Sequence, residues 1–407
     1  MMYICTSTYG PALLGTPVTT IDLSQRYFTL PPREYYVSGQ IFAEEFDKVF
    51  SRQWIYVGHK SQFPQRGSFM TLDFAGEKLL IVRGEENQFY GYFNVCRHRG
   101  YPVCEAETGT ARAFVCPYHM WRYELHGSLK SVPKLRDGEF FDYQDYRLEK
   151  INVATWHGMI FFHIGADPAL LSTVLSGFDS DVAYFEIEGT HLAHEVKLDL
   201  EANWKVSAEN FNECYHCPGS HPTFCRVVDV PRMQNEAQSW FNPDDAVNAF
   251  IGGNTGMPLT GGWQTLSADG NLISGKLLGA CTSEDAAVGL NVGINLLPNY
   301  FYAGFYVDHW WAQSIFPISP SRSRMVFRWY VREDAVEDRD YILEDLLRVT
   351  QTTYLEDIAL IEKTYQGVMS RKYSPGPIVA KNEPLMYSYV STYWSMMGAS
   401  KRSNSKW

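Results

Sequence analysis

Two short segments of the chain each combine a cysteine with a histidine. The first is Cys96-Arg97-His98, and after seventeen further residues the second follows as Cys116-Pro117-Tyr118-His119. A zinc finger usually pairs cysteine with cysteine and histidine with histidine, often with one pair on a helix. The alternating order favours a two-iron cluster, in which one iron binds Cys96 and Cys116 and the other binds His98 and His119. Such a cluster accepts and passes on single electrons.

A second group of ionisable residues lies in the stretch WKVSAENFNECYHC, which we expect to be helical up to Pro218. Glu209, Glu213 and His216 are spaced i, i+4 and i+7, so on a helix they would share one face. His221 follows the break and could turn back toward His216. Two histidines and one carboxylate form the facial triad with which Fe(II) oxygenases bind O₂.

The third ligand of such an iron must come from elsewhere in the chain. We expect a long helix from Asp338 to Ser370, and Asp357 lies in an apolar part of it. Glu356 and Glu362 are alternatives that helical periodicity does not exclude.

The segment 96–129 resembles the Rieske clusters of ring-hydroxylating and related oxygenases. ENFNECYHCPGSHP (209–222) is similar to the iron motif of the same family and matches it as Glu213, His216 and His221. The resemblance also favours Asp357 as the third iron ligand, because an acidic pair there precedes an apolar helical run.

This resemblance implies a head-to-tail homotrimer in which the cluster of one subunit faces the iron of the next. Glu213 would bridge His216 to a neighbour's His119, at a position where many relatives have aspartate. The cofactors would be a [2Fe–2S] cluster, mononuclear Fe(II) and O₂. Electrons would come from NAD(P)H through a separate flavin and iron–sulfur reductase, since the chain has no Gly-rich dinucleotide motif.

Several stretches, among them GGWQTLSADG and NLLPNYF, resemble the branch that oxidises quaternary ammonium compounds such as glycine betaine, stachydrine, carnitine and choline. Hydroxylation of an N-methyl group there releases formaldehyde. A cationic substrate needs aromatic faces, and the candidates are Trp263, Tyr302, Tyr306, Trp310 and Trp311. Three alternatives stay open: an aromatic-ring dioxygenase that forms a cis-diol, a non-enzymatic electron carrier, and a zinc-stabilised binding module.

The pattern of elements predicts an α+β protein of two domains. Short alternating apolar runs between about 69 and 162 indicate a small antiparallel β domain, preceded by an amphipathic helix at 42–54. Strands near 194–203, 292–306 and 309–332, with the helices named above, indicate an antiparallel sheet with packed helices. We expect an N-terminal segment at 1–45, the cluster domain at 46–165 and the iron domain at 166–407.

Composition excludes some classes of partner. The 407 residues include 35 basic and 46 acidic side chains, and the net charge of −11 opposes binding to nucleic acid. No signal peptide or membrane-spanning run is evident, so we expect a cytoplasmic protein. Eight sparse cysteines predict reduced thiols. We therefore interpret Cys214 and Cys217 as an incidental Cys-x-x-Cys without a thioredoxin-like role.

Overall fold

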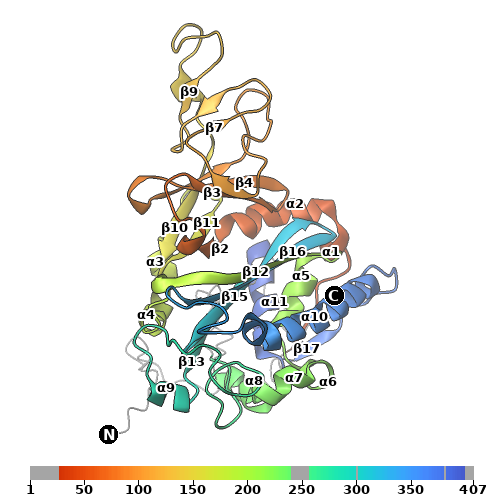
Figure 1. Cartoon of the computed structure of the whole chain (residues 1–407). Coiled ribbons are helices and arrows are strands. Elements are labelled where there is room, and N and C mark those ends of the chain that lie inside the picture. Colours follow the sequence, from red (N-terminus) through yellow and green to blue (C-terminus); the bar gives the residue numbers. More distant parts are fainter. Residues whose placement is uncertain (1–26, 240–255, 299–300, 380–381, 399–407) are drawn as a thin grey trace, which may run out of the picture.

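The computed structural model describes residues 27–239, 256–298, 301–379 and 382–398. Residues 1–26 of the expected N-terminal segment lie outside this range. The described part consists of a β-rich domain, at the top of Figure 1, on a larger domain in which helices pack on a sheet. This confirms the expected α+β class. None of the helices formed by the described residues combines the length and apolarity needed to cross a lipid bilayer.

The β-rich domain is built on a seven-stranded antiparallel sheet, in the order β2-β11-β10-β5-β4-β3-β6. Its strands are β2 (Ile55–His59), β3 (Ser68–Phe74), β4 (Glu77–Arg83), β5 (Phe89–Phe93), β6 (Thr108–Thr110), β10 (Lys150–Trp156) and β11 (Met159–His163). The predicted helix at 42–54 is shorter than expected. It is α2 (Gly39–Lys48), capped by the Ser38 hydroxyl, and a 3-10 turn (Phe50–Arg52) follows it.

A second, three-stranded sheet projects from this domain and forms the tip of the molecule (Figure 1). It consists of β7 (Phe114–Val115), β8 (Arg122–Tyr123) and β9 (Leu129–Ser131). The two predicted cluster segments lie in the loop after β5 and in the turn between β7 and β8. Both are therefore strand-end loops at one end of the molecule.

The larger domain contains a five-stranded antiparallel sheet in the order β12-β16-β15-β14-β13. Its strands are β12 (Thr190–Leu200), β13 (Asn291–Leu296), β14 (Phe301–Tyr306), β15 (His309–Ser319) and β16 (Arg322–Arg332). Short helices α3 (Leu171–Val174) and α4 (Asp179–Ala183) connect the two domains. The strands predicted from alternation and β-branched or aromatic content all occur.

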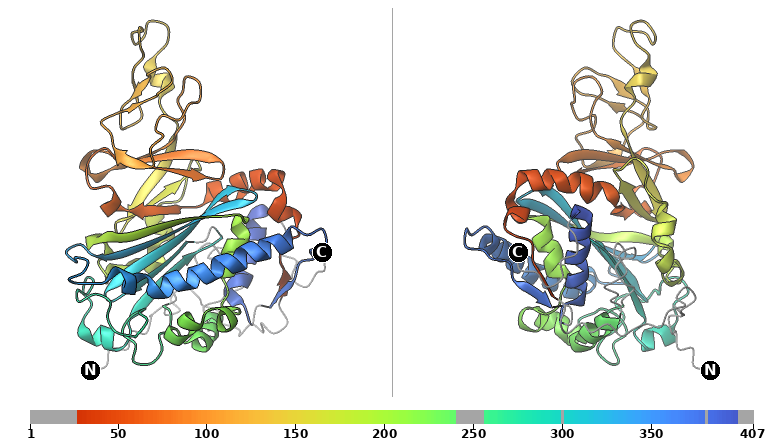
Figure 2. Two further views of the ribbon diagram at one scale, coloured as in Figure 1. Left: turned by 45° about the vertical axis from the view of Figure 1, so that its right-hand side comes forward. Right: turned by 180° about the vertical axis from the view of Figure 1, so that it is seen from behind.

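The two faces of this sheet pack against different neighbours. One face contacts α5 (Trp204–Phe211) and α10 (Leu343–Val368), and α10 runs along the sheet in Figure 2. The other face packs on Tyr56 of β2, Phe161 of β11 and the connecting helices, so this second core joins the two domains. Because strand residues alternate between the faces, each side chain points either toward the helices or toward this core.

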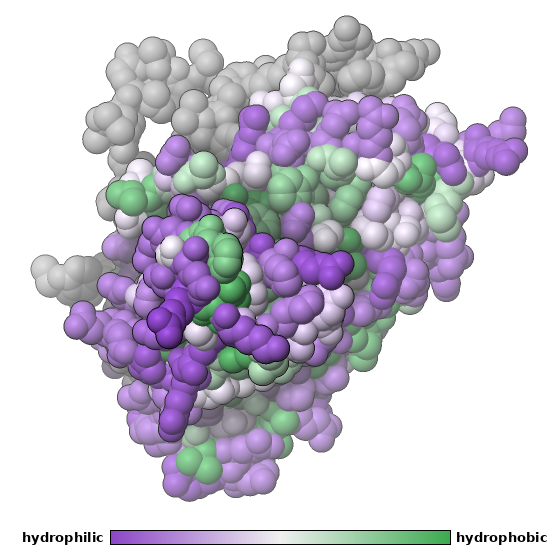
Figure 3. All heavy atoms as spheres, turned by 90° about the horizontal axis from the view of Figure 1, so that it is seen from above, coloured by the Kyte–Doolittle hydropathy of each residue, from purple (hydrophilic) through white to green (hydrophobic). Residues whose placement is uncertain are grey.

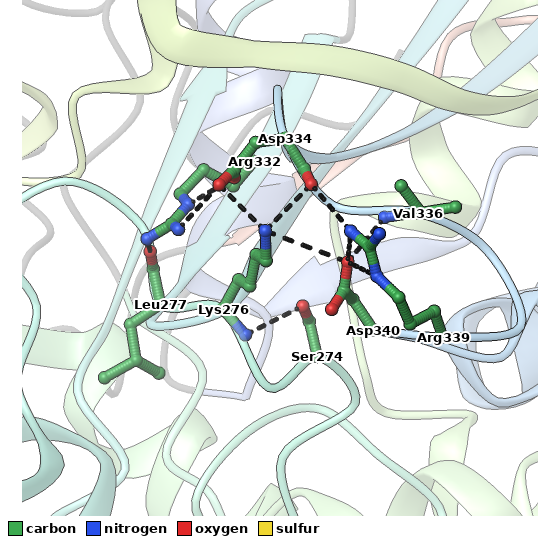
Figure 4. A network of polar contacts seen from close by, with 8 residues as sticks. All are labelled: Ser274, Lys276, Leu277, Arg332, Asp334, Val336, Arg339 and Asp340. Carbon is green, nitrogen blue, oxygen red and sulfur yellow. Dashed lines mark hydrogen bonds and ion pairs between the residues drawn. The ribbon is translucent and has the colours of Figure 1, made fainter.

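A polar network fixes the turn that leads from β16 into α10 (Figure 4). Lys276 Nζ lies 2.8 Å from Asp334 Oδ2 and 3.8 Å from Asp340 Oδ2. Arg332 forms an ion pair with Asp334, and Arg339 forms one with Asp340. Exposed ion pairs are individually weak, but together these contacts hold the start of α10, the helix that carries Asp357.

Candidate metal centres and substrate pocket

The two cysteine–histidine loops at the tip have matching backbone hydrogen bonds. Cys96 N–H donates to Tyr101 O, and Gly100 N–H donates to Cys96 O. In the second loop Cys116 N–H donates to Trp121 O, and Met120 N–H donates to Cys116 O. Gly100 and Met120 are both in the left-handed region, with φ of 77° and 61°. The two loops thus present their cysteines and histidines in equivalent ways.

The four predicted cluster ligands form a thiol pair and an imidazole pair. Cys96 and Cys116 are buried and interact with each other, and burial raises the pKa of the Cys116 thiol. His98 and His119 turn their Nδ1 atoms toward each other at 3.1 Å. The Trp121 indole stacks on His98 with 5.0 Å between ring centroids. The Tyr123 hydroxyl lies 3.4 Å from Cys96 Sγ, within hydrogen-bond distance.

The spacing of these donors fits a two-metal cluster better than a single zinc ion. Ligand atoms on one tetrahedral zinc lie within about 4 Å of one another. Among the described residues, His216, Cys217 and His221 offer donor atoms that all lie within 4.8 Å of one another. At the tip, Cys96 interacts with Cys116 and His98 faces His119, as expected if each pair binds its own iron.

The predicted iron ligands converge beside the five-stranded sheet of the larger domain. His216 Nε2 lies 3.0 Å from His221 Nε2 and 3.2 Å from Asp357 Oδ1, and His221 Nε2 lies 3.0 Å from Asp357 Oδ1. Three ligand atoms about 2.1 Å from one metal and at right angles to each other would be about 3 Å apart. The nitrogen and oxygen donors present therefore fit a facial iron site.

Each iron histidine is oriented by a second carboxylate at its other ring nitrogen. His216 Nδ1 donates to Glu213 Oε1 at 2.5 Å, and His221 Nδ1 donates to Glu356 Oε2 at 2.8 Å. These bonds place the Nε2 lone pairs toward the metal position. Glu356, an alternative iron ligand in the sequence, instead supports His221. Glu362 lies away from the site and accepts from Glu201 N–H.

The charges at this site favour a bound cation. Burial alone would raise the pKa of Asp357, but hydrogen bonds from both imidazoles outweigh burial and lower it. Burial lowers the pKa of His216, yet Asp357 and Glu213 outweigh it and raise this pKa to about 9. Without a metal the site therefore attracts protons, and a metal cation would replace them.

The predicted helix through these residues is wrong in its extent. α5 ends at Phe211, because Asn212 Nδ2 bonds back to Ala208 O and Glu213 Oε2 accepts from the backbone N–H groups of Tyr215 and His216. Such local side-chain bonds compete with helical ones. Glu209 consequently does not share a face with Glu213, and it accepts from the buried Tyr36 hydroxyl at 2.7 Å.

The expectation of reduced thiols is wrong for one pair of cysteines. Cys214 and Cys217 form a disulfide with 4.9 Å between their Cα atoms, and this ring encloses His216. Cys217 lies close to both imidazoles, but its sulfur is not a free thiolate and cannot act as a third ligand. The sequence pattern Cys-x-x-Cys permitted this bond, and only the tight turn after α5 brings the two residues together.

A largely apolar pocket opens beside the three iron ligands. Its lining includes Tyr302, Trp311, Phe327 and Tyr354, and the ring centroids of Tyr302 and Trp311 are 5.2 Å apart. Gly304 lies between these rings, where a Cβ would come within 3.2 Å of the Trp311 indole nitrogen. The glycine therefore leaves room for the aromatic wall.

The five aromatic residues proposed from the sequence occupy different places. Tyr302 and Trp311 line the pocket, and Tyr306 lies on the same sheet face, stacked on His309. Trp310 points to the opposite face because it alternates with Trp311, and it stacks on Tyr330 at 3.8 Å. Trp263 packs over Gly270 and is not among the described pocket residues. The structure thus excludes Trp310 from this pocket.

Comparisons with protein families match both halves of the chain. Residues 53–153 match the Rieske [2Fe-2S] domain, and residues 187–399 match the ring hydroxylating alpha subunit (catalytic domain).

Among curated relatives, the glycine betaine monooxygenase oxygenase subunit of Pseudomonas aeruginosa is 30% identical over 384 residues, covering 90% of this chain and 88% of the relative. The carnitine monooxygenase oxygenase subunit of Escherichia coli is 30% identical over 210 residues, or 51% of this chain and 56% of the relative.

Solved structures share the fold. The quaternary ammonium Rieske monooxygenase CntA superposes with a TM-score of 0.70 at 21% identity, covering 92% of this chain and 96% of that one. Naphthalene 1,2-dioxygenase from Rhodococcus sp. superposes with a TM-score of 0.63 at 19% identity, covering 92% and 95%.

Proposed function

Since the chain belongs to the Rieske non-heme iron oxygenases, we propose that it is the oxygenase component of a monooxygenase that hydroxylates a quaternary ammonium compound. Membership in the family means a Rieske [2Fe–2S] cluster, a mononuclear non-heme iron and electrons supplied by a reductase. We assign the cluster to Cys96, His98, Cys116 and His119, and the iron to His216, His221 and Asp357.

The observation that carries this function is the convergence of His216, His221 and Asp357 within 3.2 Å of one another beside an aromatic pocket. When bound, the iron supplies O₂ activation and the cluster supplies electrons. The aromatic faces of Tyr302 and Trp311 suit a quaternary ammonium cation, which accepts no hydrogen bond and gains from ring quadrupoles. The relatives named for glycine betaine and carnitine support the same substrate class.

We propose that oxidation occurs at an N-methyl group, so that the hydroxylated product loses formaldehyde. The reductase would be a flavin and iron–sulfur protein that uses NAD(P)H, and a cytoplasmic location would place the enzyme beside that electron donor. A cis-diol from an aromatic ring is the alternative, and the likeness to naphthalene 1,2-dioxygenase concerns the fold alone.

A head-to-tail homotrimer would bring the two centres of neighbouring subunits together, with Glu213 between His216 and the partner subunit's His119. Glu213 is bound to His216 and lies beside Tyr215, which is 68% exposed. At the tip, Tyr118 and Met120 flank His119 and are 52% and 57% exposed. The view from above in Figure 3 shows hydrophobic side chains among hydrophilic ones at this end of the molecule. Sedimentation velocity should give the mass of three chains, and a monomer would contradict the proposal.

The function is tested by metal analysis followed by product analysis. Anaerobically purified protein should contain about three irons and two sulfides per chain and give a rhombic signal of the reduced cluster. With a reductase and glycine betaine, choline or carnitine, formaldehyde should form with O₂ consumption. A cis-diol from an aromatic compound would favour the alternative, and zinc without sulfide would overturn the assignment.

A further inference from the structure

Three polar side chains form a row across the five-stranded sheet of the larger domain, on the face that lines the pocket. Asn295 of β13 is the register partner of Tyr302 of β14, and Tyr302 is the register partner of Gln313 of β15. Register partners in an antiparallel sheet project from the same face. All three residues line the pocket together with His216, His221 and Asp357. We call Asn295, Tyr302 and Gln313 the polar row.

Each residue of the polar row has a buried polar atom with no hydrogen-bond partner among the described residues. These atoms are Asn295 Oδ1, Tyr302 OH and Gln313 Nε2. The residues are only 4%, 7% and 1% exposed. Buried polar groups nearly always have a hydrogen-bond partner. Three unpaired polar atoms in one row of a pocket therefore indicate a ligand that supplies the partners.

A hydrogen bond to Asn212 determines which side-chain atom of Asn295 is left for a ligand. Asn212 Nδ2 donates to Ala208 O at 2.8 Å, which leaves Asn212 Oδ1 as an acceptor. Asn295 Nδ2 donates to that oxygen at 2.9 Å. Asn295 Oδ1 is therefore the atom that remains for the pocket, and it can only accept a hydrogen bond.

The polar row thus offers an acceptor, a hydroxyl that can act either way, and an amide donor. An alcohol matches this set, because its O–H can donate to Asn295 Oδ1 while its oxygen accepts from Tyr302 OH or Gln313 Nε2. A carboxylate can accept from the two donors, but it has no hydrogen to donate and would place its negative charge beside Asn295 Oδ1, which can only accept.

The charges of the pocket favour the same choice. The described residues that line it include the carboxylates of Glu213, Asp357 and Glu383, and none of these residues is lysine or arginine. Burial raises the pKa of Glu383, and the nearby Glu213 raises it further. A further carboxylate brought by the ligand would be repelled by Glu213 and Glu383, whereas a cation with a neutral hydroxyl would not.

This inference rests on the proposed quaternary ammonium function. We propose that the polar row binds an alcohol hydroxyl of the substrate. The enzyme would then prefer a quaternary ammonium alcohol to a quaternary ammonium carboxylate. The aromatic wall holds the cationic end, and the polar row determines which of several trimethylammonium compounds binds most tightly. This assigns specificity to Asn295, Tyr302 and Gln313.

The test is calorimetric titration of the anaerobic, iron-loaded enzyme with three ligands of similar size: choline, glycine betaine and ethyltrimethylammonium. Choline should bind at least about tenfold more tightly than the other two, since each hydrogen bond to the row is worth about fivefold to tenfold. Tyr302→Phe and Gln313→Leu should each reduce the preference for choline over ethyltrimethylammonium by about that factor. Tyr330→Phe is the control, because this tyrosine is also buried but lies on the opposite sheet face.

The outcomes separate this inference from the proposed function. If all three cations bind but glycine betaine binds as tightly as choline, or if both variants keep the wild-type preference, the role of the polar row is refuted and the quaternary ammonium function stands. If none of the three binds to protein that carries both metal centres, the proposed function fails and this inference fails with it.

Discussion

The two metal centres that we propose differ in how far apart their ligands lie in the chain and in how exposed these ligands are. The cluster ligands come from two adjacent loops between Cys96 and His119, and His98 is exposed at the tip. The iron ligands join a turn after α5 with Asp357 of α10, which is only 2% exposed. The cluster centre is local and open to a partner, and the iron centre is long-range and enclosed. A local site suits electron exchange, and an enclosed one suits controlled O₂ chemistry.

Asp357→Asn should break the iron centre and leave the cluster intact. Losing this anionic ligand should remove the mononuclear iron and reduce substrate oxidation by more than about a hundredfold, because even support of a metal ligand is worth ten- to a hundredfold. Iron and sulfide analysis with the reduced-cluster spectrum measures both centres in one sample. Asp345→Asn, on the exposed start of α10, is the control and should keep both. An unchanged iron content in Asp357→Asn would refute the assignment.

Glu356→Gln should lower the affinity of the site for iron without abolishing iron binding. The carboxylate accepts from His221 Nδ1, and loss of its charge should lower iron affinity by about ten- to a hundredfold. Competition with a chelator of known affinity measures the change. Glu362→Gln, six residues further along α10, should have the wild-type affinity. Equal affinities in the two variants would show that Glu356 has no part in the site.

Replacing Cys214 and Cys217 by serine should loosen the turn that holds His216. For so short a loop, the chain-entropy model predicts a loss of about 2 kcal/mol in the free energy of unfolding. Denaturant titration of the double variant measures this loss, and Cys225→Ser, a nearby free cysteine, is the control. If alkylation of the unfolded wild-type protein under nonreducing conditions labels all eight cysteines, the disulfide is absent.

Tyr123→Phe should have the smallest effect, a shift in the reduction potential of the cluster. It removes the hydroxyl that faces Cys96 Sγ, and loss of a hydrogen bond to a cluster sulfur lowers the reduction potential, here by roughly tens of millivolts. A redox titration followed by absorption measures the shift. Tyr92→Phe is the control, because the Tyr92 hydroxyl is buried but donates to Leu125 O. Identical potentials for both variants would show that this contact does not affect the cluster.

The sequence was informative where chemistry depends on neighbours in the chain. The spacing of Cys96, His98, Cys116 and His119 indicated a cluster because both pairs lie on short loops, and alternation predicted the strands around them. The same reasoning failed after Phe211, where side-chain hydrogen bonds from Asn212 and Glu213 end the helix early. It also missed the Cys214–Cys217 disulfide, which depends on that early end.

The sequence by itself determined the α+β class, and it predicted the cluster ligands and the histidine pair of the iron site, since each depends on local spacing or composition. Helical periodicity left Asp357 and Glu356 open, and the resemblance favoured Asp357. The tertiary structure separates them, because adjacent residues of one helix differ in direction: Asp357 lies beside Nε2 of both histidines and Glu356 beside Nδ1 of His221. It likewise separated Trp311 from Trp310 and aligned Asn295, Tyr302 and Gln313. Strand register and helix packing join residues that are distant in the chain, and such contacts leave little trace in a single sequence.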